Sequence, residues 1–361
     1  MLNVLILGVG QCGNRILDTI NREAKRFSKY YSRQKFPSKL ETLAINTAIN
    51  DLKELRYTLA KDRIHVPNLY GVGANRILGK KGFYEHRDFI MQTIEDRGDF
   101  DLVFAITSAA GGTGSSFTPL MINELKKTYK VPIIAIIVLP FQEEGTIYLQ
   151  NAAFCLKEMA ESKVDGILLV DNQYLKRFGG DIYSAYDKIN KMTAERLLFL
   201  IESLDSEMLA VTDLGDFITV MSGGLNIGTM GYYKADKNTS INAAILGSLK
   251  PSGLLFPVDV YKEGARAMII IQGSKEYLDL EKITKEIEKL SADIGQVFKG
   301  IVIKKGTPKV LSVFTLQSIP KLKKLYSLAV YAIESEHERR KRAKQKLKEA
   351  FSRIDGLEAV Y

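Results

Sequence analysis

Short runs of Val, Ile and Leu alternate with helix-like segments through the first half of the chain, and this alternation limits the fold more than any other feature of the sequence. Runs that are apolar throughout are typical of strands covered on both faces, and strands that alternate with helices form parallel sheets. The predicted strands are residues 3–7, 40–46, 64–67, 102–107, 132–139 and 166–171, and the predicted helices are residues 13–27, 82–96, 116–129 and 147–163. We therefore expect an α/β fold in which a parallel sheet carries helices on both faces.

Polar or glycine-rich loops follow all six predicted strands. They lie at residues 8–14, 46–48, 71–75, 110–116, 140–145 and 171–174. Because the carboxyl ends of parallel strands share one edge of the sheet, these loops are expected to meet where such folds bind their ligands. Two loops of this kind arise easily by chance, but six predict a large polar binding site.

The fourth of these loops, residues 110–116, reads Ala-Gly-Gly-Thr-Gly-Ser-Ser and joins a buried strand to a helix. Glycines let the backbone approach a ligand closely, and the N–H groups at a helix start attract anions, which is the chemistry of a phosphate cradle. No lysine follows the last glycine, so the loop is not a Walker A motif. Alone it fits a tight turn without a ligand equally well, so the prediction of a phosphate site depends on the companion loops.

Composition excludes several classes of protein. The chain has 361 residues, of which 46% are hydrophobic and 26% charged, as is ordinary for a soluble globular protein. No uncharged apolar run reaches the roughly 18 residues of a transmembrane helix. The two cysteines, Cys12 and Cys155, are far apart and suit a reducing cytoplasm, where we expect the protein to act. The net charge of +9 arises largely from residues 321–348, so it says little about the core.

The second half of the chain begins with a long helical pattern and continues as a second αβ segment. Predicted elements are a helix at 183–204, strands at 267–273, 297–303 and 310–316, a helix at 280–292 and a terminal helix at 320–351. This organisation predicts a ligand-binding domain at 1–182, a core helix at 183–204, a smaller α/β domain at 205–318 and a basic tail at 319–361.

The loops, in this order, resemble those of the tubulin/FtsZ superfamily of GTP-driven polymers. Gly10-Gln11-Cys12-Gly13-Asn14 looks like the first phosphate loop of tubulin, and Gly111-Gly112-Thr113-Gly114-Ser115 looks like the superfamily's glycine loop. The resemblance extends from residue 1 to about residue 316. It implies a Rossmann-like GTPase domain, a central core helix and a smaller activation domain.

Three features resemble the archaeal CetZ branch in particular. Asn46-Thr47-Ala48 replaces a loop that is usually acidic in FtsZ, and the segment 144–148 with Asn151-Ala152-Ala153 follows the CetZ pattern. The chain also lacks the linker and terminal peptide of bacterial FtsZ. Two positions depart from the superfamily. Ala110 replaces a glycine and must tolerate a negative φ, and Ser116 stands where glycine is common and is available to cap the following helix.

The resemblance implies that GTP or GDP, with Mg²⁺, occupies the loops. The residues expected to contact the nucleotide are Gly10, Gln11, Cys12, Asn14, Ala48, Gly73, Ala74, Asn75, Ala110, Gly111, Gly112, Thr113, Gly114, Ser115, Pro140, Glu144, Asn172, Tyr186 and Asn190. Residues 111–115 would hold the β- and γ-phosphates, with the hydroxyls of Thr113 and Ser115 assisting, and residues 73–75 would sense the γ-phosphate. Gln11 would hold Mg²⁺ through water.

At the base, Asn14, Asn172 and Asn190 are candidates for reading guanine, because an amide both donates and accepts. Tyr186 and Asn190 lie four residues apart and so share a helix face, where Tyr186 is placed to stack on the base. Glu144 is the ribose candidate. Three simpler interpretations stay open: Cys12 as a small buried thiol, Tyr186 as an ordinary aromatic and Glu144 as a solvated carboxylate.

Hydrolysis in the superfamily needs a loop from the next subunit, which here is residues 211–217. Asp213 and Asp216 are three residues apart at a helix start, so both carboxylates can orient the attacking water. The alternative is that Asp213 caps the helix and Asp216 favours its dipole, and both roles can coexist. Val211 stands where the family commonly has an asparagine that reaches the neighbouring nucleotide.

The resemblance to the tubulin/FtsZ superfamily implies a GTPase that polymerises head to tail with copies of itself, and the CetZ resemblance implies control of cell shape. The alternatives are an FtsZ-like division protein, a nucleotide-binding scaffold that hydrolyses weakly, and a dinucleotide enzyme that uses the G-x-G-x-x-G match at residues 8–13. The basic tail predicts a solvated helix or a contact with a membrane or acidic partner, without specific nucleic-acid binding.

Overall fold

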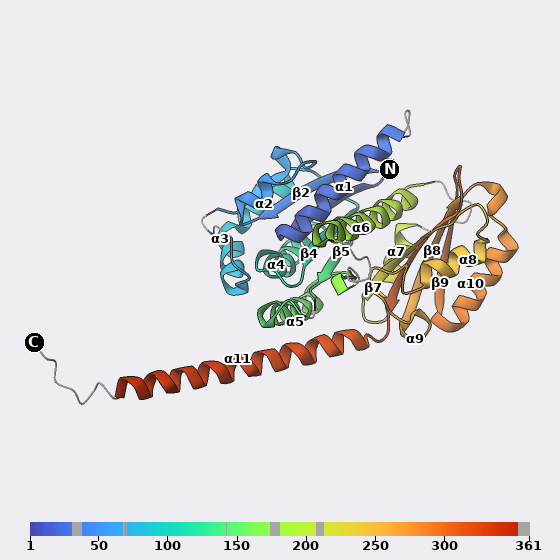
Figure 1. The fold of residues 1–361 in the computed structure, drawn as a ribbon. Coiled ribbons are helices and arrows are strands. Elements are labelled where there is room, and N and C mark those ends of the chain that lie inside the picture. The colour runs from blue at the N-terminus through green and yellow to red at the C-terminus, as the bar shows by residue number, and fades with distance from the viewer. Residues whose placement is uncertain are drawn as a thin grey trace, which may run out of the picture.

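The protein is described from a computed structural model, which covers residues 1–30, 38–67, 69, 71–141, 143–173, 181–206 and 213–352. Within these residues one ten-stranded sheet crosses the molecule in the order β3-β2-β1-β4-β5-β6-β7-β10-β8-β9 (Figure 1). Neighbouring strands pair in parallel from β3 to β7. The predicted α/β class with a parallel sheet is confirmed.

All six strands predicted in the first half are present, with ends that differ by a few residues. They are β1 (Asn3–Val9), β2 (Lys39–Asn46), β3 (Arg63–His65), β4 (Leu102–Ser108), β5 (Ile133–Leu139) and β6 (Gly166–Asp171). The helices are α1 (Gly10–Tyr30), a short α2 (Ile49–Lys53) that the sequence did not predict, α3 (Arg76–Glu95), α4 (Thr113–Thr128) and α5 (Thr146–Glu161). Helices α1, α3 and α4 begin three to six residues earlier than predicted, which moves parts of the predicted loops into helices.

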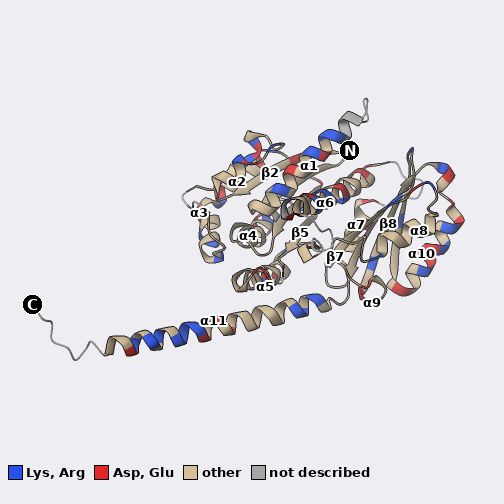
Figure 2. Ribbon diagram, viewed as in Figure 1, with Lys and Arg blue, Asp and Glu red and all other residues tan. Residues whose placement is uncertain are grey.

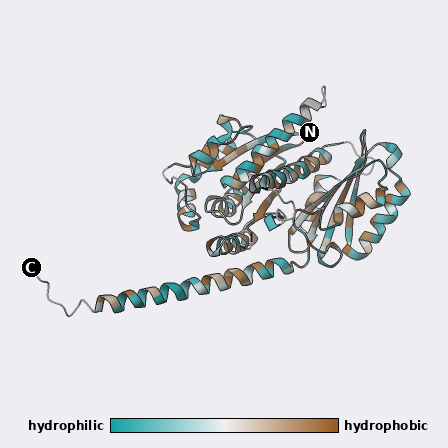
Figure 3. Ribbon diagram, viewed as in Figure 1, coloured by the Kyte–Doolittle hydropathy of each residue, from teal (hydrophilic) through white to brown (hydrophobic). Residues whose placement is uncertain are grey.

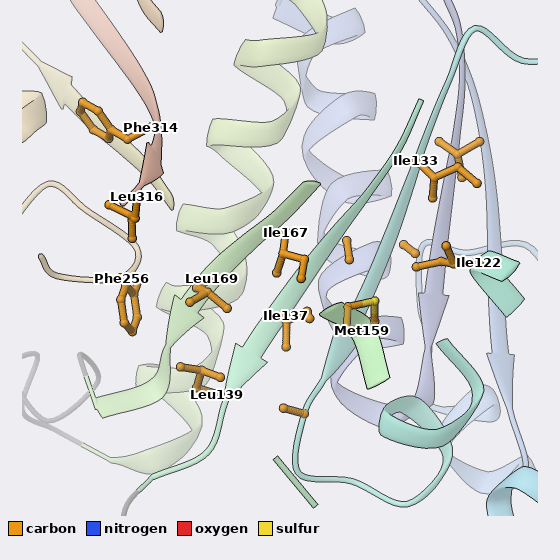
Figure 4. Packing of buried hydrophobic residues seen from close by; sticks show 14 of the residues in the cluster. Ile122, Ile133, Ile137, Leu139, Met159, Ile167, Leu169, Phe256, Phe314 and Leu316 are labelled. Atoms are coloured by element: carbon orange, nitrogen blue, oxygen red, sulfur yellow. The ribbon is translucent and has the colours of Figure 1, made fainter. Parts of the chain in front are cut away.

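Helices cover both faces of this sheet. Consecutive strand residues point to opposite faces, and because both sets of side chains are apolar, both faces must be buried. In β1, Leu5 and Leu7 belong to one hydrophobic cluster, while Val4 and Ile6 belong to the other. Figure 4 shows the first cluster, which packs strand residues such as Ile137 and Ile167 against helices α4 and α5. The second cluster packs the opposite face against α1 and α6. Hydrophobic residues accordingly concentrate in the central strands (Figure 3).

The second half continues the same sheet. Its elements are α6 (Ile182–Leu204), α7 (Leu214–Met221), β7 (Ile227–Lys234), α8 (Ile241–Leu249), α9 (Val260–Glu263), β8 (Gly264–Gly273), α10 (Leu280–Ile294), β9 (Gln296–Ile303) and β10 (Lys309–Leu316). Strand β10 runs antiparallel between β7 and β8, and β9 pairs in parallel with β8. The sequence did not predict β7 or α8. Two glycines within β7 interrupt its hydrophobic pattern. Glycine is needed at both positions, because a Cβ at Gly228 would meet the carbonyl of Phe314 and a Cβ at Gly231 would meet the carbonyl of Ser248.

Helix α11 (Pro320–Ser352) lies along α5 and runs on past the body of the protein (Figure 1). Its buried side chains are Leu322, Leu325, Ala329 and Ala332, all in the first half of the helix. Beyond Glu336 the described residues are exposed, and Figure 2 shows many of them to be Lys or Arg. A search of the described part of the chain finds no helix long and apolar enough to span a bilayer.

Candidate nucleotide site

A cavity of about 510 Å³ opens at the carboxyl ends of β1, β2 and β4, where all six predicted loops and helix α6 contribute lining residues. Fifteen of the predicted residues line it: Gly10, Gln11, Cys12, Ala48, Gly73, Ala74, Ala110, Gly111, Gly112, Thr113, Gly114, Glu144, Asn172, Tyr186 and Asn190. Segments from residue 9 to residue 190 therefore converge on one site, as the order of the loops predicted.

Asn14 does not line the cavity. It lies one turn into α1, is fully buried, and its Nδ2 donates to the carbonyl of Ile45 at 3.2 Å. The side chain thus fixes α1 to β2 beneath the site, while its Oδ1 has no hydrogen-bond partner in the described structure, so its role at the base stays a prediction. Its neighbour Arg15, which the sequence analysis did not select, lines the cavity instead. Consecutive helix residues point about 100° apart, which is why Arg15 faces the cavity while Asn14 faces β2.

Ser115, Asn75 and Pro140 also fall outside the lining. The Ser115 hydroxyl donates to the carbonyl of Gly111 and accepts from Arg76 Nε at 3.0 Å, so its one proton is already used within the protein. Asn75 caps α3 by accepting from the N–H of Leu78 at 3.1 Å. Pro140, the first residue of the fifth loop, is buried. The predicted help of the Ser115 hydroxyl to a phosphate therefore does not fit this geometry.

The glycine loop ends at a helix start that points into the cavity. Helix α4 begins at Thr113, and its N-cap, Gly112, offers no side-chain cap. The first N–H groups of a helix have no partner within the helix and carry the positive end of its dipole, so they favour an anion. Ser116 lies inside α4 and donates to the carbonyl of Gly112 at 2.7 Å, which corrects its expected role as a cap. Ala110 is absent from the described residues with positive φ, as its Cβ requires.

Glycine serves two different purposes around this cavity. A Cβ at Gly10 would lie 3.0 Å from the backbone nitrogen of Gly114, so glycine there lets the first and fourth loops touch. A Cβ at Gly73 or Gly111 would meet nothing within 4 Å. Packing therefore does not require glycine at either position, although the φ of 51° at Gly73 favours it, and the open space beside both residues is available to a ligand.

The opposite end of the cavity carries amide and aromatic side chains. Asn172 is 7% exposed, and its Oδ1 has no hydrogen-bond partner in the described structure. An unpaired buried acceptor is costly unless a ligand donor reaches it, so this oxygen fits a base N–H. Tyr186 packs edge-on against Phe141, with ring centroids 6.3 Å apart and an interplanar angle of 79°. It retains contact with the cavity, together with Asn190 one turn along α6.

Glu144 lies at the rim of the cavity and accepts from the N–H of Phe141 at 3.0 Å. Burial raises the pKa of Glu144, and the hydrogen bond from Phe141 offsets part of that rise. Burial also raises the pKa of Cys12 to about 12, with Arg15 lowering it and Glu144 raising it. Cys12 therefore contacts the cavity as a protonated thiol at neutral pH, without the reactivity of a thiolate.

The structure adds an acidic residue that the sequence analysis missed. Asp51 on α2 lines the cavity, and its carboxylate accepts from Gln11 Nε2 at 3.0 Å and from Asn46 Nδ2 at 2.9 Å. Its position five residues after Asn46, on a helix too short to predict, hid it. Among the described residues no cluster of three or more His, Cys, Asp or Glu could hold a metal by itself. One carboxylate beside an amide suits Mg²⁺ that keeps most of its ligands as water and phosphate.

Asp213 and Asp216 lie at the start of α7, and neither lines the cavity of its own chain. They form a reciprocal capping box. Asp213 accepts from the N–H of Asp216 at 2.9 Å, and Asp216 accepts from the N–H of Asp213 at 3.3 Å. The capping interpretation of this pair is thus confirmed. Val211 lies outside the described residues.

Comparison with known proteins agrees with this geometry. Residues 3–180 match the model of the Tubulin/FtsZ family, GTPase domain. A tubulin-like protein CetZ from Methanothrix thermoacetophila is 66% identical over 367 residues, which cover 100% of both chains. The solved structure of a CetZ from Methanosaeta thermophila matches with a TM-score of 0.91 and 64% identity over 98% of each chain. A CetZ2 from Haloferax volcanii, solved as a GTPγS-bound protofilament, matches with a TM-score of 0.80 and 23% identity over 93% of this chain and 100% of its own, and so shares the fold.

The fold and the loop-lined cavity define a GTPase domain of the tubulin type. The chain belongs to the tubulin/FtsZ family and, over its full length, to the CetZ proteins within it. The resemblance inferred from the order of the loops is confirmed.

Proposed function

We propose that the protein binds GTP and GDP in the cavity, with the phosphates at the start of α4 and the base at Asn172. One observation carries this proposal: the cavity has a helix N-terminus, which suits phosphate, at one end and the unpartnered Oδ1 of Asn172, which suits a base N–H, at the other. The GTPγS bound in the related CetZ2 protofilament supports it. Gln11 and Asp51 are the side chains that would hold Mg²⁺ through water, and the ion would neutralise phosphate charge.

Guanine is favoured over adenine because a buried acceptor needs a donor on the edge of the base. Guanine offers N–H donors at N1 and N2, where adenine offers an acceptor and a C–H, so adenine bound in the same orientation would leave Asn172 Oδ1 unpaired. Nucleotide retained by the purified protein, identified by chromatography, should be GDP or GTP. Retained NAD or FAD would instead support the dinucleotide alternative. Asn172→Leu should weaken GDP binding, and unchanged affinity would remove Asn172 from the base site.

We further propose that copies of the chain stack head to tail, and that Asp213 and Asp216 of one copy complete the site of the next. Asp213 is exposed and Asp216 is partly exposed, so the capping box that they form lies at the surface. They would orient the water that attacks the γ-phosphate. GTP turnover per molecule should therefore rise with protein concentration. A rate independent of concentration would indicate a GTPase that works as a monomer.

The two roles of Asp213 can be separated by substitution. Asn caps helices as well as Asp does, so Asp213→Asn should keep the stability of α7 while it removes the charge. We expect Asp213→Asn and Asp216→Ala to bind GTP normally and to lose most turnover. Turnover at the wild-type rate in either variant would show that its carboxylate serves only the helix cap.

An exposed apolar surface beside the cavity supports stacking. Ile77 on α3 is 83% exposed, and Ile147 and Phe154 on α5 are 45% and 44% exposed. The three line a second hollow that shares Gly73 and Ala74 with the nucleotide cavity. Contiguous exposed apolar side chains mark interaction surfaces, and a second copy placed here would also cover the phosphate loops.

Ile77→Asp tests this surface. It should abolish sedimentable polymer and leave the affinity for GDP unchanged, because the side chain points away from the body of the chain. Phe89→Asp, at a 54% exposed apolar residue twelve positions further along α3, is the matched control and should still assemble. Equal assembly by both variants would place the interface elsewhere.

We assign the nucleotide role to residues 1–182, the connecting role to helix 183–204 and the completing role to 205–318. We propose control of cell shape as the cellular role, which the CetZ relationship supports, and division is the alternative. Ala110, beside the phosphates, favours one further candidate, a polymer scaffold with weak hydrolysis. Normal assembly with low GTP turnover would support that scaffold.

The exposed basic end of α11 is suited to an acidic partner or membrane surface, and the protein is expected to act in the cytoplasm.

A further inference from the structure

Helix α5 holds two of the phosphate loops together through one buried side chain. Asn151 is 6% exposed, and its Nδ2 donates to the carbonyl of Ala74 at 2.8 Å and to the carbonyl of Ala110 at 2.9 Å. Ala74 belongs to the third loop and Ala110 to the fourth, and both line the nucleotide cavity. Both protons of one amide are therefore spent on joining these two loops.

The loops that Asn151 joins are already in tight contact. A Cβ at Gly112 would lie 3.0 Å from the Cα of Ala74 and 3.1 Å from its nitrogen. Ala74 itself has a φ of 60°, which is unusual for a residue with a Cβ and must be held by its surroundings. The hydrogen bond to its carbonyl is one such constraint. The spacing of the two loops thus depends on contacts that a small movement would break.

A second bridge starts from the same face of α5, seven residues further on. Glu158 accepts from Arg76 Nη2 at 2.9 Å and from Lys80 Nζ at 2.7 Å. Arg76 is 8% exposed and donates in turn to the hydroxyl and the carbonyl of Ser115, at 3.0 and 2.9 Å. Arg76 directly follows the third loop, and Ser115 lies in the first turn of α4. Helix α5 therefore fixes both loops at two points.

We propose that Asn151 is a positioning residue that sets the distance between the third and fourth loops, so that the site prefers a nucleoside triphosphate to the diphosphate. The inference rests on the proposed GTP site, in which the γ-phosphate contacts both loops and the β-phosphate contacts the fourth. A ligand that bridges two loops gains from their fixed spacing, whereas one that contacts a single loop does not. The loss of Asn151 should therefore weaken triphosphate binding selectively.

The test compares the affinities of the full chain for GTPγS and GDP by equilibrium titration. In Asn151→Leu, which removes the donors at similar volume, GTPγS affinity should fall about tenfold more than GDP affinity, as expected for losing one or two net hydrogen bonds. Asn151→Ser is smaller and keeps one hydroxyl donor, so its preference for GTPγS should lie between those of the wild type and Asn151→Leu. It also provides a reading if Asn151→Leu does not fold.

Asn242→Leu is the matched control, because Asn242 is a partly buried helical amide that donates to Glu286 at 3.2 Å away from the cavity. It should leave both affinities unchanged. Equal losses of GTPγS and GDP affinity in the Asn151 variants would overturn the positioning role while leaving the nucleotide site intact. Failure of the wild-type protein to bind either nucleotide would instead refute the proposed function itself.

Discussion

Two neighbouring glycines in the fourth loop provide a sharp test of how the cavity is built. Gly112 has a φ of −77° and a ψ of −58°, which alanine adopts freely, so Gly112→Ala creates no backbone strain. The added Cβ would meet the Val72 side chain and lie 3.0 and 3.1 Å from backbone atoms of Ala74. Val72 is 6% exposed and cannot swing into solvent. The third loop must move, and overpacking of this kind costs about 1–3 kcal/mol.

Gly111→Ala is the matched control, one residue away in the same loop. Its Cβ would meet nothing within 4 Å, and Gly111 is not among the residues with positive φ. Replacing glycine by alanine at a compatible position stabilises a protein by about 0.4–1 kcal/mol, because it reduces the conformational entropy of the unfolded chain. We therefore expect Gly111→Ala to be as stable as the wild type or slightly more so. Its methyl group enters space assigned to the phosphates, and GDP affinity should fall more than about tenfold, or 1.4 kcal/mol.

The assay measures the thermal midpoint and the urea midpoint of nucleotide-free protein, followed by GDP titration. Gly112→Ala should lower the thermal midpoint by several degrees, since about 1 kcal/mol corresponds to about 2–4 °C in chains of 150–250 residues and less in longer ones. Gly111→Ala should not lower it. Equal thermal midpoints in the two variants would refute the packing of Gly112 against Ala74. Unchanged GDP affinity in Gly111→Ala would refute the assignment of the open space to phosphate.

Three further predictions concern charge and reactivity. Burial raises the pKa of Cys12 to about 12, so iodoacetamide should alkylate Cys12 of the nucleotide-free protein slowly, at a rate that still rises above pH 10. A rate that reaches its plateau near pH 9 would contradict the burial of the thiol. Burial alone would raise the pKa of Glu158, but hydrogen bonds from Arg76 and Lys80 outweigh it and lower the pKa, so this stabilisation is present at neutral pH and lost as the pH falls through the lowered pKa. Glu158→Gln should accordingly cost about 1–3 kcal/mol at pH 7 in urea unfolding and progressively less below pH 4, and a pH-independent cost would reject the ion pair. Deletion of residues 337–361 removes no buried side chain among the described residues, so the thermal midpoint should not change. Co-sedimentation of the protein with acidic vesicles should be lost. Unchanged co-sedimentation would exclude the tail as the membrane contact.

Local patterns were sufficient for the first half of the fold. Strands β1, β4 and β5 are buried on both faces, and runs such as Ile133–Leu139 contain no polar residue that would permit another interpretation. Strand β7 was missed because Gly228 and Gly231 weaken its pattern. Those glycines are required by the carbonyls of Phe314 and Ser248, which are distant in sequence. A local pattern cannot register a contact of that kind.

Within the site, the sequence identified the loops better than the individual side chains. Motif and order located the glycine loop, Asn172 and the paired residues Tyr186 and Asn190 at one cavity. They did not reveal that α1 begins at Gly10, which turns Asn14 toward β2.

The sequence by itself determined the α/β class, the family and the edge of the sheet where the ligand site lies, because hydrophobic periodicity and loop motifs are local properties of the chain. The tertiary structure alone decided which side chains face the cavity. It brought Asp51 beside Gln11, turned the Ser115 hydroxyl to Arg76, and placed Asn151 between two loops. These pairings depend on where helices start and how they pack, and a hydrogen bond between distant residues leaves no periodic trace in the sequence.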